Sequence, residues 1–150
     1  MNFVSSEMLP LLLALISGVL MAVQGSLNTG LSKAIGLLEA TFIVHFTGTV
    51  LVMILLFLFS MGKGNWNAWQ AAPWYSWLGG VVGVAIIYLV AASIPQVGVA
   101  NATTAIIVGQ VLTAILIDHF GGFGLDRVAC SPQQIGGLIL LAVGARLLLK

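Results

Sequence analysis

The chain has 150 residues, of which 60% are hydrophobic and only 6% are charged. A soluble domain carries about 25% charged residues, so nine charged side chains, 5 basic and 4 acidic, are too few to cover a water-soluble fold of this size. The net charge of +1 comes without a basic patch, and nothing suggests a nucleic-acid partner. The composition indicates an all-α integral membrane protein.

Five stretches are long and apolar enough to cross a bilayer, which takes about 20 helical residues. They cover residues 9–31, 37–61, 74–94, 97–118 and 133–149. The N-terminal segment has no Lys or Arg before its apolar run, unlike a cleaved secretory signal. We therefore expect the first stretch to remain as a span. The prediction is one transmembrane domain, residues 1–150, built as a bundle of five helices.

The connections between the spans contain residues that are typical of turns and helix ends. Residues 33–36 predict a tight turn after the first span, and Pro95 predicts the end of the third, because proline disfavours helix at the residue before it. All four tryptophans lie in residues 66–77 and indicate an anchor in the headgroup layer, with an aromatic cage as the alternative. Cys130 is the only cysteine, so no internal disulfide is possible.

The positive charges give almost no preferred orientation. If the N-terminal side is called side A, its loops hold Lys63 and Arg127, while side B holds Lys33, Arg146 and Lys150. Lys and Arg in short loops set orientation, and here the difference is 3 − 2 = 1. An antiparallel homodimer, an orientation fixed by a partner chain, and a parallel oligomer are all compatible with this balance.

Polar side chains inside spans are costly and call for a reason. Gln24 and Asn28 lie four residues apart on one face of the first span. Glu39 lies in the first turn of the second span, and His45 follows near mid-depth. The alternatives are hydrogen bonds to neighbouring helices for the amides, a solvated carboxylate at a helix start for Glu39, and a satisfied interior side chain for His45.

The fourth span adds Asn101 near its start and Gln110 near its middle. Since the first span ends on side B where the second and fourth begin, we expect a polar layer in that half of the bundle. Glu39, and less directly His45, are candidates for proton coupling, because removal from water favours the protonated form of a carboxylic acid. A proton and a cationic substrate would then compete for one carboxylate.

Other kinds of site find little support in the sequence. No catalytic constellation, phosphate-binding loop or metal-ligand spacing stands out, so we expect no enzyme activity, no metal and no cofactor. Gly137 and Gly144 lie seven residues apart on one face of the fifth span. Small residues allow close helix contact in lipid, and we expect this face to pack against a second subunit, with packing inside one subunit as the alternative.

Two stretches, GVLMAVQGSLNTGLSKAIGLLEATFIVHFTGT and GVANATTAIIVGQVLTAILIDHFGGFG, resemble the five-span YdcZ-type family of bacterial inner-membrane proteins. This family lies within the drug/metabolite transporter superfamily. The Gln24/Asn28 pair and the run from Gly109 and Gln110 to the segment Asp118-His119-Phe120-Gly121 carry the resemblance, which covers nearly the whole chain.

The resemblance implies a multi-pass protein of the bacterial inner membrane, related to small multidrug resistance proteins. It also implies an antiparallel dimer, or a pair with a similar short paralogue. One departure matters: those small exporters place their key glutamate in the first span, where this chain has Gln24 and Asn28. Its candidate membrane-embedded glutamate is Glu39 on the second span.

We therefore predict a small secondary transporter that moves a small polar or amphipathic solute by alternating access. Gln24 and Asn28 would orient the solute, Asn101 and Gln110 would line the cavity, and Glu39 would carry charge or protons. A passive channel and a non-transporting membrane subunit that scaffolds another protein are the alternatives. The only other partners expected are membrane lipid and an unknown small molecule.

Overall fold

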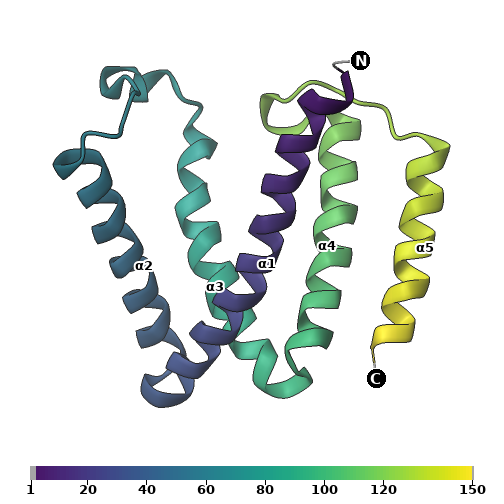
Figure 1. Cartoon of the computed structure of the whole chain (residues 1–150), viewed down its shortest axis with the longest axis horizontal. Coiled ribbons are helices and arrows are strands. Elements are labelled where there is room, and N and C mark those ends of the chain that lie inside the picture. Colours follow the sequence, from purple (N-terminus) through teal and green to yellow (C-terminus); the bar gives the residue numbers. More distant parts are fainter. Residues whose placement is uncertain (1–2, 150) are drawn as a thin grey trace. The chain divides into compact units, whose positions relative to one another are not determined.

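The computed structural model describes the backbone of residues 3–149 and the side chains of residues 8–149. Its long helices are α1 (Phe3–Ile35), α2 (Leu37–Met53), α3 (Leu78–Val97), α4 (Val99–Phe120) and α5 (Pro132–Leu148), shown in Figure 1. No strand occurs in the part of the chain that the structure describes. The predicted all-α membrane fold is confirmed.

Four helical stretches are long and apolar enough to span a bilayer. They are Met8–Ile35, Leu37–Leu58, Trp74–Val97 and Val99–Phe120, with 28, 22, 24 and 22 residues. The second combines α2 with the π-helix η1 (Ile54–Leu58), and the third combines the 3₁₀-helix η3 (Trp74–Trp77) with α3. Helix α5 has 17 residues, close to the lower limit of about 17 for a span.

The hydrophobic core is small and consists mostly of alanine. Among the described residues, the buried hydrophobic side chains are Ala40, Ala91, Ile94, Ala102 and Ala145. Larger apolar side chains on every long helix remain exposed. Lipid tails are as apolar as leucine, so helices in a membrane associate through close backbone approach rather than through burial of a large core. Small residues at the helix contacts fit that requirement.

The chain divides into two compact units, Met1–Pro95 and Gln96–Lys150. In the first unit α1 packs against α2, and α1 also approaches α3 closely at Gly25. A Cβ atom at Gly25 would lie 3.1 Å from Val90 Cγ1 and 3.2 Å from Ile94 Cδ1. In the second unit α4 packs against α5. The prediction of one transmembrane domain stays a prediction.

Single glycines form the sharp corners between consecutive helices. Gly36 separates α1 from α2 with φ 104° and ψ 156°, and Gly98 separates α3 from α4 with φ 85° and ψ 160°. Only glycine adopts this backbone region readily. Figure 1 shows α1 and α2 meeting at a corner and diverging from it. The predicted turn of residues 33–36 is therefore a single residue.

Helix α3 contradicts the prediction that the third span ends before Pro95. The helix contains Pro95 and continues to Val97. Proline removes one backbone donor and crowds the preceding turn, but this position lies in the last turn, where few helical hydrogen bonds remain to be lost. The helix ends instead before Gly98, which has a positive φ of 85°.

The connection between α2 and α3 carries the aromatic residues. It contains the 3₁₀-helix η2 (Trp66–Ala71), followed by η3. All four tryptophans are exposed: Trp66, Trp69, Trp74 and Trp77. Trp69 and Trp77 make an edge-on ring contact, with centroids 5.8 Å apart. Exposed indoles next to the start of a span are the arrangement that a headgroup anchor requires.

Candidate functional site

A cluster of buried polar side chains lies beside the Gly36 corner. In the described part of the chain, the buried polar residues are Asn28, Thr29, Ser32 and Thr41, with exposed fractions of 7%, 5%, 8% and 2%. The first three lie on the last two turns of α1, and Thr41 lies on the second turn of α2. Because α1 packs against α2, this cluster occupies the first part of their contact after the corner.

The three hydroxyl groups of this cluster are satisfied by their own helices. Thr29 Oγ1 donates to the Gly25 carbonyl at 2.8 Å, and Ser32 Oγ donates to the Thr29 carbonyl at 2.9 Å. Thr41 Oγ1 donates to the Leu37 carbonyl at 2.8 Å. Their donors are used within the helix, so these hydroxyls make the contact polar without needing a ligand.

Asn28 is different, because its side chain has no hydrogen-bond partner among the described residues. Every fully buried side-chain nitrogen or oxygen in this part of the chain has a partner, so the amide of Asn28 must keep some access to the surface. Asn28 therefore offers two donors and an acceptor that the folded unit does not use.

Glu39 lies at the start of α2 with its carboxylate folded back over the corner. The residue is exposed, and a Cβ atom added at Gly36 would overlap its Oε2. The first turn of a helix presents unpaired N–H groups and favours negative charge. Within the first unit the carboxylate thus occupies the position expected of a charge at a helix start, and it makes no ion pair with a described side chain.

His45 lies between α2 and α3. Its Nδ1 is 2.9 Å from the Thr41 carbonyl oxygen one turn earlier. On the other side of the ring, Nε2 would lie 3.7 Å from a Cβ atom built at Gly83 of α3. The side chain is half-buried. Of the predicted residues, His45 is the one that the structure places at a contact between α2 and α3.

The remaining amides predicted to line the site are less enclosed. Gln24 lies one turn before Asn28 on α1 and is exposed. In the second unit, Asn101 is half-buried in the first turn of α4, and Gln110 is exposed near its middle. None of the three side chains has a hydrogen-bond partner among the described residues. The structure brings Asn28 into the buried cluster, while the shared polar layer across the two units stays a prediction.

Sequence reasoning missed Thr29, Ser32 and Gly25. A signal was present: Gly25, Asn28, Ser32 and Gly36 recur at intervals of three or four residues, which marks one face of a helix. A second signal is the similarity of GLLEAT (36–41) to GVANAT (98–103). It aligns the two corner glycines, places Asn101 at the position of Glu39, and matches two buried alanines.

The loop after α4 is fastened to the end of that helix. The backbone N–H of Cys130 donates to His119 Nδ1 at 3.2 Å, and Arg127 Nε donates to the His119 carbonyl at 2.9 Å. The N–H of Val128 donates to the Asp118 carbonyl at 2.8 Å. Asp118 and His119 thus close a loop, and Ser131 caps α5 through a reciprocal hydrogen-bond pair with Gln134.

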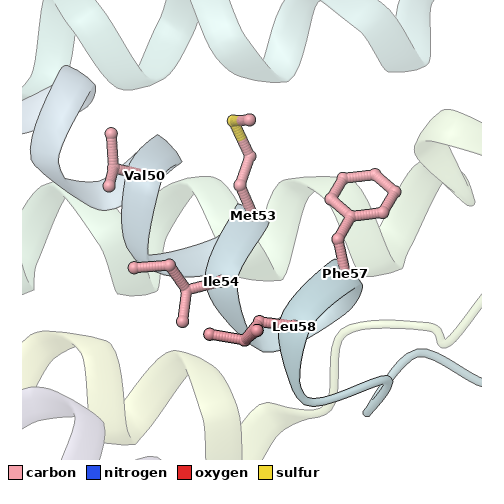
Figure 2. A pocket seen from close by; sticks show the side chains of 5 residues that line it. All are labelled: Val50, Met53, Ile54, Phe57 and Leu58. Carbon is pink, nitrogen blue, oxygen red and sulfur yellow. The ribbon is translucent and has the colours of Figure 1, made fainter.

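Two other features carry no solute chemistry. Figure 2 shows a shallow hollow of about 270 Å³ near the end of α2, lined by Val50, Met53, Ile54, Phe57 and Leu58. It has no hydrogen-bonding side chain, so it suits apolar groups only. On α5, Cβ atoms added at Gly137 and Gly144 would meet no described atom within 4 Å, and the predicted dimer face is open.

Comparison with known families gives one match. The sequence profile of the family DMT_YdcZ, described as an inner membrane exporter, matches residues 9–147. The matched region contains the corner glycines, the polar cluster and every residue predicted to line a site. No curated protein and no solved structure was found to match the chain.

Proposed function

We propose that this chain, which belongs to the YdcZ family of inner membrane exporters, moves a small polar or amphipathic solute by proton-coupled alternating access. The observation that carries the proposal is Asn28, a buried amide with unused hydrogen-bonding capacity beside the α1–α2 corner. A polar side chain is costly inside a membrane, and one that the fold leaves unpaired supports a solute pathway.

In this proposal Asn28 and Gln24 bind the polar part of the solute, and Asn101 and Gln110 add further hydrogen bonds. Glu39 binds either a proton or a positively charged group of the solute. Because the two occupants compete for one carboxylate, entry of protons drives release of solute. His45 is the second candidate for proton coupling.

We further propose that the working unit is an antiparallel homodimer, or a pair with a similar paralogue. The near balance of Lys and Arg between the two sides supports insertion in both orientations. The exposed amides of Gln24 and Gln110 also support a second subunit, because polar side chains on a membrane helix find partners on neighbouring helices. Gly137 and Gly144 would lie in that contact.

The test uses inverted membrane vesicles that contain the protein and a respiration-driven proton gradient, followed by acridine orange fluorescence. Solutes are added one at a time: ethidium, tetraphenylphosphonium, and a set of amino acids, sugars and organic acids. We expect at least one to dissipate the gradient saturably. The Glu39→Gln variant should reduce this response to that of vesicles lacking the protein.

Asp126→Asn is the matched control, because it removes the same charge from the loop after α4. It should leave the response unchanged. A solute response that survives in Glu39→Gln would remove Glu39 from the coupling mechanism. Solute flux without proton movement would favour a passive channel, and the absence of any flux would favour a scaffolding subunit.

A further inference from the structure

We propose that His45 is a proton-binding site inside the membrane, that it takes its proton at Nε2, and that Gly83 of α3 keeps space open there. The inference rests on the proposed function in one respect, namely that protons cross with the solute. Nε2 of His45 would hold the proton on its way from one side of the membrane to the other, and proton binding at this atom can be measured without any solute.

The hydrogen bond to Thr41 fixes the tautomer of the neutral ring. A backbone carbonyl can only accept, so His45 Nδ1, which lies 2.9 Å from the Thr41 oxygen, must carry a hydrogen and donate it. In the neutral imidazole the other nitrogen then has a free lone pair. Nε2 is therefore the basic atom, and it has no hydrogen-bond partner among the described residues.

The residue of α3 that faces Nε2 is a glycine, Gly83, which has no side chain. A Cβ atom built at Gly83 would lie 3.7 Å from Nε2, which is ordinary contact, so an alanine methyl would fit. A branched side chain would extend beyond Cβ into the space next to the nitrogen. Gly79 and Gly80 lie about one turn earlier on α3, and Cβ atoms built there would meet nothing within 4 Å. Of these three glycines, Gly83 is the one that faces His45.

The charged residues with described side chains in the first unit are Lys33, Glu39 and Lys63, and Lys63 lies in the loop between η1 and η2. On α2, Glu39 lies six residues before His45, on a different face of the helix. On α3, Tyr88 lies five residues after Gly83, also on a different face. On α1, Lys33 lies in the last turn at the corner. The proton on Nε2 would thus be the only charge at this depth among these groups.

Proton binding at Nε2 leaves the fold unchanged. The lone pair takes a proton from a hydronium ion, which leaves as water, and the ring becomes an imidazolium with hydrogens on both nitrogens. The Nδ1–H bond to Thr41 persists in both states, and release of the Nε2 proton to water restores the neutral ring. No hydrogen bond within the unit is made or broken in either step.

His119 provides an internal contrast. Its Nδ1 accepts the Cys130 N–H at 3.2 Å, so its neutral form carries the hydrogen on Nε2. Protonation of His119 places a hydrogen on Nδ1 and breaks that bond. The chain has two histidines, and the structure assigns them opposite tautomers. Only His45 can gain a proton without disturbing its neighbours.

The experiment is ¹⁵N-histidine magnetic resonance on the full chain in lipid bilayers over a pH series. His45→Gln and His119→Gln assign the two rings. At alkaline pH we expect His45 with hydrogen on Nδ1 and His119 with hydrogen on Nε2. On acidification the Nε2 signal of His45 should shift reversibly. A neutral His45 with hydrogen on Nε2, or a His45 that does not titrate before the protein unfolds, would overturn the proposal.

Gly83→Val tests the role of the open space, with Gly79→Val as the matched control on the same helix. Valine at position 83 would extend two methyl groups beyond the Cβ position toward Nε2 and would cover the lone pair that takes the proton. We expect loss of the protonated His45 signal at a pH where the wild-type protein and Gly79→Val still show it. Equal titration in all three proteins would exclude Gly83 from the site.

These outcomes are separate from failure of the proposed function. If His45 titrates as described but no solute collapses a proton gradient, the proton site stands and the exporter mechanism does not. If a solute collapses the gradient and His45 stays neutral throughout, the exporter stands and its proton is carried elsewhere.

Discussion

Polar residues of similar chemistry have different surroundings in this protein, and hydrogen bonding separates them. Thr29 and Ser32 bond to carbonyl groups of their own helix, and His119 holds a loop. Asn28 is similarly buried, and its side chain makes no hydrogen bond with a described residue. None of its polar atoms is fully enclosed without a partner, so the fold leaves the hydrogen-bonding groups of Asn28 unused.

Asn28→Leu should therefore separate stability from function. Removing the unpaired amide should leave the melting temperature in detergent unchanged or raise it, by a stabilisation of about 1 kcal/mol, while the solute response of the vesicle assay is lost. Thr29→Val is the control, since it removes a hydroxyl that its own helix satisfies, and should retain most of the response. A strongly destabilised Asn28→Leu would instead assign Asn28 a structural role.

At the scale of helices, glycine determines where the chain turns and where helices touch. Gly36 and Gly98 lie in a backbone region that other residues occupy at a cost, and Gly25 lies against two branched side chains of α3. These three positions use different properties of glycine: positive φ at the corners, and the absence of a side chain at the contact.

Alanine at either corner should destabilise the protein. We expect Gly36→Ala and Gly98→Ala each to cost about 1–3 kcal/mol of unfolding free energy, from backbone strain alone. Gly36→Ala also displaces the Glu39 carboxylate, so Glu39→Ala should reduce its effect but not that of Gly98→Ala. Thermal unfolding in detergent measures this, with Gly30→Ala as the control within a helix.

Valine at Gly25 should weaken the contact between α1 and α3. A Cβ atom at this position would lie 3.1 Å from Val90 Cγ1, and the two methyl groups of valine would extend beyond it. Overpacking of this kind lowers the free energy of unfolding by about 1–3 kcal/mol. Gly18→Val, two turns earlier on α1 and with no described atom within 4 Å of its Cβ, should change the melting temperature little. Equal effects of the two variants would mean that the contact is looser than described.

The helices were largely predictable, and their ends were less so. Apolar runs of 20 residues located the spans, because the bilayer imposes that length. The same runs could not show that the turn of residues 33–36 is Gly36 alone, since Lys33 and Ile35 are equally compatible with helix. Nor could they show that α3 passes through Pro95, because a proline in the last turn costs less than one in the interior.

At the scale of the whole molecule, the sequence predicts which residues are polar but not which of them meet. Asn28 and His45 were both singled out, yet the burial of Asn28 and the tautomer of His45 follow only from positions in space. Exposed amides on α1 and α4 have no partner among the described residues. The sequence shows that these amides are costly in lipid, but it does not show which groups would pair with them.

Cys130 is a natural reporter for insertion in both orientations, because it is the only cysteine and lies in the loop between α4 and α5, which the five-span prediction places on side A. In cells with a permeabilised outer membrane, an impermeant maleimide should label about half of the chains, since nearly balanced loop charges give no preferred orientation. Complete labelling after lysis gives the total. Labelling of all or none in intact cells would mean one fixed orientation.

The double variant Asn65→Lys, Asn67→Lys adds positive charge to the other side-A loop. It should retain side A in the cytoplasm and reduce labelling of Cys130 from outside to near zero. If the protein works as an antiparallel homodimer, the same variant should lose its solute response while still reaching the membrane. Preserved activity would favour a parallel assembly.

The corner at Gly36 also constrains how this protein can move. Because only one residue separates α1 from α2, the linker is too short for either helix to tilt independently. A change in the angle between them requires a change in the two dihedral angles of that glycine. Otherwise the two helices move together as one rigid body. Any rocking that exposes Asn28 to one side of the membrane must therefore move the outer ends of both helices, about 25 Å or more from the pivot.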